Sequence, residues 1–480
     1  MRPILTSIAI FILSLNFFGQ ENDLPVNWTL EACVDYALEN NISIRQSMLD
    51  QESADISKSE AIGNYLPSLN GNGSNSWNSG LTQNITTGVL ENQVVRNLSV
   101  NATAGITLFD GLRNLRVFQR AKLEQLASQY SLKLMKDDIA LFVANAYLEI
   151  LVNKQQLAVL IEQNEVTKEQ IELTRETVEV GTAPEGDLLE IEATNADEQQ
   201  QIIVAENNLR ISKINLAQTL LIEDYKNFDI ADNEYNIPLT DILSKSPDEI
   251  LEKAKQERYE VQVAEQQVEL AEKDIEIARS SLYPTLNGFI NYNTRENDRG
   301  RTVGGRLDPD EPTRQIGVVE GTQQAVVTGN FIPETAGPSS FFSQLARNDG
   351  LSYGVQLNIP IFNGFATRNS IKRAEVNVRR AEFQLEQAEL DLEANVYQAY
   401  VDAQGAAKAY EAAEKAVESQ RLAFEYAQER FNVGVSNAFE LSQSKFRLTN
   451  AENRLINAKY DFIFNIKVLE LFFGIRVVEY

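Results

Sequence analysis

Several segments of the chain alternate between apolar and polar residues, which is the pattern of a β-strand with one apolar face. In residues 98–108 every second residue is apolar, and the residues between them are Ser, Asn, Thr or Gly. Residues 286–292 and 351–359 follow much the same pattern. The segment after Pro67 is mostly Gly, Ser and Asn and predicts a weaker strand. The sequence therefore predicts about four strands of roughly ten residues each.

Two much longer segments, at about 113–179 and 370–430, read as helices and contain no proline. At about 1.5 Å per residue each helix is on the order of 90–100 Å long, which indicates a coiled coil or a tube rather than a globular domain. Shorter helices are expected at about 44–64, 187–222, 248–281 and 440–473. Stacked end to end in pairs, they match each long helix and would pack against it as an antiparallel partner. Along the last one, apolar or small residues recur at a coiled-coil spacing from Leu441 to Phe472.

The chain contains an internal duplication with two constant offsets. The matched pairs are Ala37 and Ala254, Pro67 and Pro284, Phe109 and Phe362, and Gly181 and Gly434. The change of offset indicates an insertion of about 36 residues between the two strands of the second copy. Each copy has the order helix, strand, polar loop, strand, very long helix, tight turn, helix. We expect a first repeat at residues 21–236 and a second at 237–480.

The predicted strands lack any further element that could cover their apolar face. Strands of about ten residues with an apolar and a polar face are typical of a membrane barrel. Four strands are too few to close a barrel. Several chains must therefore contribute to one barrel, and this need for oligomerisation follows from geometry alone.

Composition narrows the function further. The formal charge is -26, which disfavours nucleic-acid binding. The chain has no histidine and only one cysteine, Cys33, so it lacks the commonest general base and any cysteine-cluster metal site. It also has no Gly-Lys dipeptide for a phosphate-binding loop. We therefore expect no enzyme, no catalytic residue, no cofactor and no metal.

The first residues predict export. Arg2 precedes a short apolar run from Ile4 to Phe18, and an acidic segment follows Gln20. This order is typical of a secretory signal peptide, expected at residues 1–20. The run is too short to span a membrane.

The whole ordered set resembles the TolC-like family of outer-membrane efflux proteins (outer membrane factors). The residues that carry the resemblance are Tyr65-Leu66-Pro67-Ser68-Leu69, Tyr283-Pro284-Thr285-Leu286, Pro360-Ile361-Phe362-Asn363-Gly364, and the two Val-Gly turns with Asp187-Leu188-Leu189 and Glu440-Leu441. The resemblance implies a mainly α fold with transmembrane β-strands, in which a homotrimer forms a 12-stranded β-barrel and a long periplasmic α-helical barrel. It also implies a passive exit channel in the cell outer membrane of a Gram-negative bacterium. The implied partners are a periplasmic adaptor (membrane fusion) protein, an inner-membrane pump and outer-membrane lipid.

The resemblance also suggests site residues at the two turns. The adaptor-contacting tip of the family matches Val180, Gly181 and Thr182, and less fully Val433, Gly434 and Val435. A helix C-terminal glycine is the structural role of both glycines. Glu440 stands where the family has an acidic ring at the periplasmic gate, and Gln443 stands where related channels carry a second acid. Glu440 could instead stabilise the N-terminus of the following helix.

The insertion at 294–348 is rich in Gly, Pro and Asp and is expected to be an extracellular loop. It carries Arg295, Arg299, Arg301, Arg306 and Arg314, which could bind lipopolysaccharide phosphates or simply be solvated. The alternative functions are a periplasmic adaptor or a coiled-coil scaffold without a channel. The sequence does not identify the cargo, which could be small molecules handled by an efflux pump or polypeptides handled by a type I secretion system.

Overall fold

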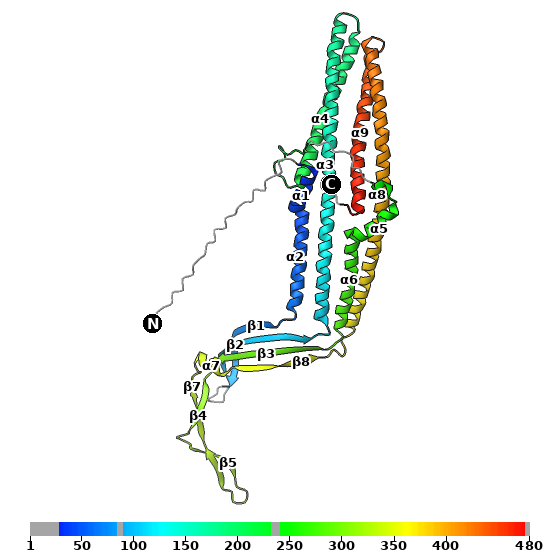
Figure 1. Ribbon diagram of the computed structural model, residues 1–480. Coiled ribbons are helices and arrows are strands. Elements are labelled where there is room, and N and C mark those ends of the chain that lie inside the picture. Colours follow the sequence, from blue (N-terminus) through cyan, green and yellow to red (C-terminus); the bar gives the residue numbers. More distant parts are fainter. Residues whose placement is uncertain (1–27, 84–89, 232–240, 476–480) are drawn as a thin grey trace, which may run out of the picture. The chain divides into compact units, whose positions relative to one another are not determined.

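The computed structural model describes residues 28–83, 90–231 and 241–475 (Figure 1). The predicted signal peptide lies outside these residues. The chain divides into two units, which we call the helical unit (up to Met48, Leu132–Tyr259 and from Glu389 onward) and the sheet unit (Leu49–Ser131 and Glu260–Ala388). Each unit takes segments from both halves of the sequence, so the units are not the two repeats. The repeat boundary near residue 236 falls outside the described residues and stays a prediction.

The sheet unit contains a four-stranded antiparallel sheet in the order β1, β2, β3, β8. Its strands are β1 (Ser68–Gln83), β2 (Leu90–Phe109), β3 (Thr285–Asn297) and β8 (Gly350–Asn358), which lie side by side in Figure 1. The four predicted strands are therefore confirmed. The weak segment after Pro67 forms β1, which is longer than the roughly ten residues expected. All sixteen residues of β1 pair with β2.

Each strand of this sheet is connected along the chain to one of the longer helices, which gives four helices in all. They are α2 (Ile42–Gly63), the start of α3 (Arg113–Glu179), α6 (Tyr259–Ser280) and the start of α8 (Ala366–Asn432). Polar contacts join α3 to its neighbours: Arg120 Nε lies 2.7 Å from Asp274 Oδ1 of α6, and Lys58 Nζ of α2 donates to Gln125 Oε1 at 2.8 Å. Small side chains at Ala61 and Ala121 are buried and allow close approach of the helices.

The insertion between β3 and β8 has secondary structure that the expectation of a loop did not include. Strands β4 (Arg301–Leu307) and β7 (Phe331–Ala336) pair, as do β5 (Thr313–Val318) and β6 (Ala325–Gly329). The short helix α7 (Phe341–Arg347) follows. The side-chain amide of its Gln344 accepts a hydrogen bond from the Asn297 N–H and donates one to the Asn297 carbonyl. The Gly, Pro and Asp residues that suggested a loop lie mainly between or at the ends of these strands.

The helical unit packs α1 (Leu30–Asn40), most of α3 and α8, α4 (Glu185–Thr219), a 3-10 turn (Ile242–Ser244), α5 (Pro247–Glu257) and α9 (Ala438–Phe472). Its largest core joins side chains of α1, α3, α4 and α9. The fully buried members include Tyr147, Ile150, Leu216, Leu220 and Ile463. Cys33 belongs to this core and is fully buried, where it acts as a small apolar residue.

The duplication is visible in the helix lengths. Helices α1 and α5 have 11 residues, α2 and α6 have 22, α3 and α8 have 67, and α4 and α9 have 35. The prediction of a single helix at 248–281 is wrong in one respect. The segment forms two helices, α5 and α6, separated at Arg258, where ψ is 130°. Asn41 makes the same break in the first copy, with ψ 135°. Arg258 is buried and paired with Asp137, and this distant contact gave no local signal in the sequence.

The predicted spacing along α9 holds in part. Leu441, Leu448, Ala451 and Leu469 are buried as expected, but between Ala451 and Leu469 the buried residues include Ile456 and Ile463 rather than Leu455 and Phe462. An α-helix has about 3.6 residues per turn, so an apolar stripe drifts away from a strict 3.5-residue spacing. The contact face of α9 follows this drift.

Candidate functional site

The four-stranded sheet has one apolar face. Its cross-strand pairs include Ile290 with Tyr353 and Tyr292 with Leu351. These side chains are exposed in the single chain, Tyr353 by 77%. An exposed apolar face of this extent requires lipid or another apolar surface. The apolar positions of the alternating pattern therefore form one continuous surface, as the sequence predicts.

The other face of the sheet is polar and largely uncharged. Thr103 Oγ1 donates to Asn291 Oδ1 at 3.1 Å, and the hydroxyls of Ser74 and Ser99 are 2.7 Å apart. Asn101 lies opposite Asn72 on β1 and Asn293 on β3. Such a row of hydroxyl and amide groups suits the wall of an aqueous path.

The sheet is open at both sides. Strands β1 and β8 are its outer strands, and in the described parts of the chain no strand pairs with their outer edges. Unpaired backbone groups in an apolar medium cost several kcal/mol each. Both edges must therefore pair with strands of another chain before this sheet can lie in lipid.

The predicted tip residues form two tight turns between long helices. Gly181, between α3 and α4, has φ +76°, and Gly434, between α8 and α9, has φ +75°. Both glycines adopt the left-handed conformation of a helix C-terminal glycine. Val180 and Val433 are each 73% exposed, so the two turns present apolar side chains to solvent. Thr182 caps its own turn, because its hydroxyl donates to the Thr177 carbonyl at 3.0 Å.

Glu440 lies in the first turn of α9, where Asn437 caps the helix by accepting from the Glu440 N–H at 2.9 Å. Its carboxylate lies 3.5 Å from Arg430 of α8, and both side chains are more than half exposed. Sequence reasoning missed this arginine, although its position in the last turn of α8, ten residues earlier, was available as a signal. Gln443 is exposed one turn farther along α9.

A buried polar cluster joins α9 to α3 and α4, and sequence reasoning missed it entirely. Lys445 of α9 is 3% exposed and lies 2.9 Å from Glu198 of α4. Its ammonium group also donates to the Thr167 hydroxyl and the Gln163 carbonyl of α3. Burial lowers the pKa of Lys445, and Glu198 opposes that shift. The cluster therefore holds α9, of the helical hairpin α8–α9, against the helical hairpin α3–α4.

The described residues contain no group of three or more His, Cys, Asp or Glu side chains that could hold a metal ion. None of the described helices is both long enough and apolar enough to cross a membrane.

One comparison with known proteins shows a family. The family model described as outer membrane efflux protein matches residues 33–220 and 250–464. A search of curated proteins gives no match.

Three similar solved structures carry the same fold over nearly the whole chain. The outer membrane protein VceC of Vibrio cholerae has 14% identity and a TM-score of 0.70, and the match covers 93% of this chain and 96% of that one. The CmeC outer membrane channel of Campylobacter jejuni has 16% identity, a TM-score of 0.70 and coverage of 96% and 92%. The open-state MtrE outer membrane channel of Neisseria gonorrhoeae has 17% identity, a TM-score of 0.69 and coverage of 93% and 89%. The predicted fold class, mainly helical with transmembrane strands in a duplicated unit, is confirmed.

Proposed function

The chain belongs to the outer membrane efflux protein family and is an outer-membrane channel, and we propose that three copies of it form the exit duct of a tripartite efflux pump or a type I secretion system. The duct conducts substrates passively from an inner-membrane transporter to the exterior. The alternative of a periplasmic adaptor or a scaffold without a channel lacks the support that the family match gives to a channel. No catalytic role is proposed.

One observation carries this proposal: the sheet has an apolar face, a polar face and two unpaired edges. Four strands per chain in three copies supply the twelve strands of a closed wall, with β1 of one copy beside β8 of the next. Closure turns the apolar face toward lipid and the Asn-, Ser- and Thr-rich face toward the lumen. The long helices form the periplasmic part of the duct.

The mass of the detergent-purified protein tests this assembly. A particle of three chain masses from the membrane fraction is the expected result, and on a gel it should run as the slower trimer without heating and as the faster single chain after heating. A water-soluble monomer would refute the shared wall, because the apolar face would then be uncovered.

We place the periplasmic gate at Glu440, with Gln443 beside it and Arg430 as a further member. Three Glu440 carboxylates around the symmetry axis would form a constriction that favours cations. Arg430, paired with each Glu440 at 3.5 Å, would partly offset this charge. Glu440→Gln should then lower cation preference in single-channel recordings, and Arg430→Gln should raise it.

Asp187 provides the matched control, since it is the repeat equivalent of Glu440 and lies in the first turn of α4. If Glu440 acts only on the helix N-terminus, Glu440→Gln and Asp187→Asn should have similar small effects on stability and none on conductance. A gate requires that only Glu440→Gln changes ion preference. Equal, unchanged conductance in both variants would exclude the gate.

We propose that the turns at Val180, Gly181 and Thr182 and at Val433, Gly434 and Val435 contact the adaptor. The exposed valines support this role, because Val180, Val433 and Val435 offer apolar side chains that a partner could bury. Replacing Val180 and Val433 with Asp should reduce dye efflux in cells while leaving conductance in planar bilayers unchanged. Unchanged efflux in the double variant would remove the turns from the adaptor interface.

A further inference from the structure

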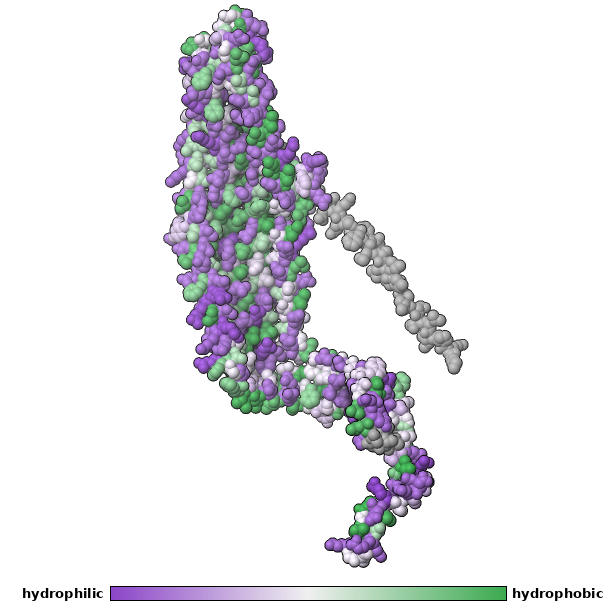
Figure 2. Space-filling view, turned by 180° about the vertical axis from the view of Figure 1, so that it is seen from behind, coloured by the Kyte–Doolittle hydropathy of each residue, from purple (hydrophilic) through white to green (hydrophobic). Residues whose placement is uncertain are grey.

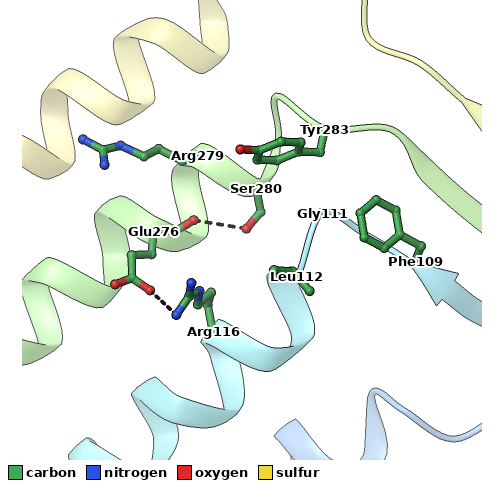
Figure 3. Close-up of a pocket in the computed structure, with 8 residues that line it drawn as sticks. All are labelled: Phe109, Gly111, Leu112, Arg116, Glu276, Arg279, Ser280 and Tyr283. Atoms are coloured by element: carbon green, nitrogen blue, oxygen red, sulfur yellow. Dashed lines mark hydrogen bonds and ion pairs between the residues drawn. The ribbon is translucent and has the colours of Figure 1, made fainter.

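A hollow of about 510 Å³ lies in the sheet unit where β2 passes into α3 and α6 passes into β3 (Figure 3). Phe109 and Leu112 border it from the first connection, and Tyr283 borders it from the second. Arg116 of α3 and Glu276 and Arg279 of α6 supply its charged groups. Residues more than 150 positions apart in the sequence thus meet around one space.

A β-bulge turns Phe109 toward the apolar face of the sheet. Thr107 pairs with Asn287 on the polar face, but the next pair joins Phe109 to Leu286, so Leu108 is the extra residue. Leu286 belongs to the apolar face, and paired residues share a face. Phe109 therefore faces the lipid side, and the hollow borders that side.

The hollow lies at the level of a belt of exposed apolar residues at the ends of the strands. The belt contains Tyr65, Leu66, Phe109, Tyr283, Ile361 and Phe362, all exposed. Figure 2 shows apolar side chains gathered where the strands meet the helices. Aromatic belts of this kind mark the boundary between the hydrocarbon core and water. Because the helices are periplasmic, this boundary is the periplasmic leaflet.

The charges around the hollow match a zwitterionic head group. Arg116 lies 2.8 Å from one oxygen of Glu276, and both residues are about one-third exposed (33% and 34%). Lys273 of α6 lies 3.1 Å from the other oxygen of Glu276. Arg279 is 58% exposed and lies 3.8 Å from Glu375, too far for a tight hydrogen-bonded pair. Guanidinium groups prefer phosphate oxygens, and a carboxylate attracts an ammonium group.

The duplication provides an internal comparison, in which the equivalent positions are divided between the two outer strands, at the start of β1 and after the end of β8. The apolar residues are kept, with Phe362 in place of Phe109 and Leu66 in place of Tyr283. The three charged residues themselves are not repeated, because Asn369 stands for Arg116, Ile62 stands for Arg279 and Ser59 stands for Glu276. A general membrane belt explains the apolar residues at both sets of positions but not the charges at one.

We propose that this hollow binds the head group of one phosphatidylethanolamine-type phospholipid of the periplasmic leaflet per chain. The phosphate lies at Arg279, the ammonium group takes the place of Lys273 at Glu276, and the first acyl carbons lie along Phe109 and Leu112 (Figure 3). Strands β2 and β3 are the inner strands of the sheet, so the hollow lies away from the seams that β1 and β8 form with other copies. The inference rests on the outer-membrane channel proposed above.

Native mass spectrometry of the detergent-purified trimer with added phosphatidylethanolamine tests the site. Up to three bound lipids per trimer are expected, and Arg279→Gln should weaken binding about tenfold, the effect of about 1.4 kcal/mol. Arg368→Gln is the matched control, because Arg368 is exposed at the start of α8 beside the equivalent positions after β8. It should bind lipid as the parent chain does. Glu276→Gln should reduce the preference for phosphatidylethanolamine over phosphatidylglycerol.

Equal lipid retention in the parent and Arg279→Gln would overturn the site, and so would equal losses in Arg279→Gln and Arg368→Gln. An unchanged lipid preference in Glu276→Gln would overturn the assignment of the ammonium group. Arg279 is the more exposed arginine, so its variant is expected to fold even if Arg116→Gln does not. The same spectrum reports the trimer mass: a trimer without lipid refutes only this inference, whereas a monomer refutes the channel assembly.

Discussion

The buried lysine of α9 allows a quantitative test of how the two hairpins hold together. Lys445 is 3% exposed, and its partner Glu198 is 14% exposed. Glu198 also accepts hydrogen bonds from Thr167 at 2.7 Å and Asn164 at 3.1 Å. Nearly every polar group in the cluster therefore has its partner inside the protein rather than in water.

Lys445→Met removes the ammonium group and leaves Glu198 as a nearly buried charge without its cation. Loss of one member of a buried ion pair costs about 3–5 kcal/mol. Residual exposure of Glu198 favours the lower value, about 3 kcal/mol. The double variant Lys445→Met with Glu198→Leu should recover most of this loss, since it leaves no buried charge.

Hydrogen exchange of α9 peptides, measured by mass spectrometry on the detergent-purified protein, checks this prediction. A loss of about 3 kcal/mol in local stability corresponds to roughly 150-fold faster exchange. Arg430→Met is the control, because the Arg430–Glu440 pair is 58% and 52% exposed and such pairs contribute about 0–1 kcal/mol. Exchange in Lys445→Met that stays within about fivefold of the parent, or a double variant as unstable as the single one, would refute the reasoning.

Three further predictions concern other parts of the chain. Gly111→Ala should lower the yield of heat-modifiable trimer far more than Gly364→Ala. Both glycines have positive φ (+69° and +61°), but a Cβ added at Gly111 would lie 2.7 Å from the Ser280 carbonyl, whereas a Cβ at Gly364 would meet open space. Equal yields of the two variants would contradict this reasoning. Burial raises the pKa of the Cys33 thiol from 9.0 to about 12, so a maleimide should label it only after denaturation. Because the folded pKa is the higher one, the associated stability is complete below pH 9.0 and is lost as the pH rises to about 12, which thermal unfolding across that range would detect. Trp77 is 64% exposed on β1 and Trp28 is buried, so brominated lipids should quench Trp77 fluorescence in a Trp28→Phe variant and leave the emission of a Trp77→Phe variant unchanged.

The sequence alone determined the features that depend on local periodicity. The long helix predicted at 113–179 has those bounds, and the alternating segment at 98–108 lies within β2. Gly181 and Gly434 were predicted to end helices, and both have positive φ. These features are local because backbone sterics and side-chain spacing within a few residues decide them. The need for strands from other chains followed from the number of predicted strands, because four strands are too few to close a barrel.

Only the tertiary structure decided which distant side chains meet. Arg258, at the helix break, pairs with the distant Asp137, and Glu198, the partner of Lys445, lies on a helix far away in the sequence. The hollow combines Arg116 and Arg279 from different repeats. A lysine on a coiled-coil helix reads as a solvated residue until the packing of three helices buries it. Charge pairing across elements depends on register and rotation, and a single sequence carries no periodic signal for either.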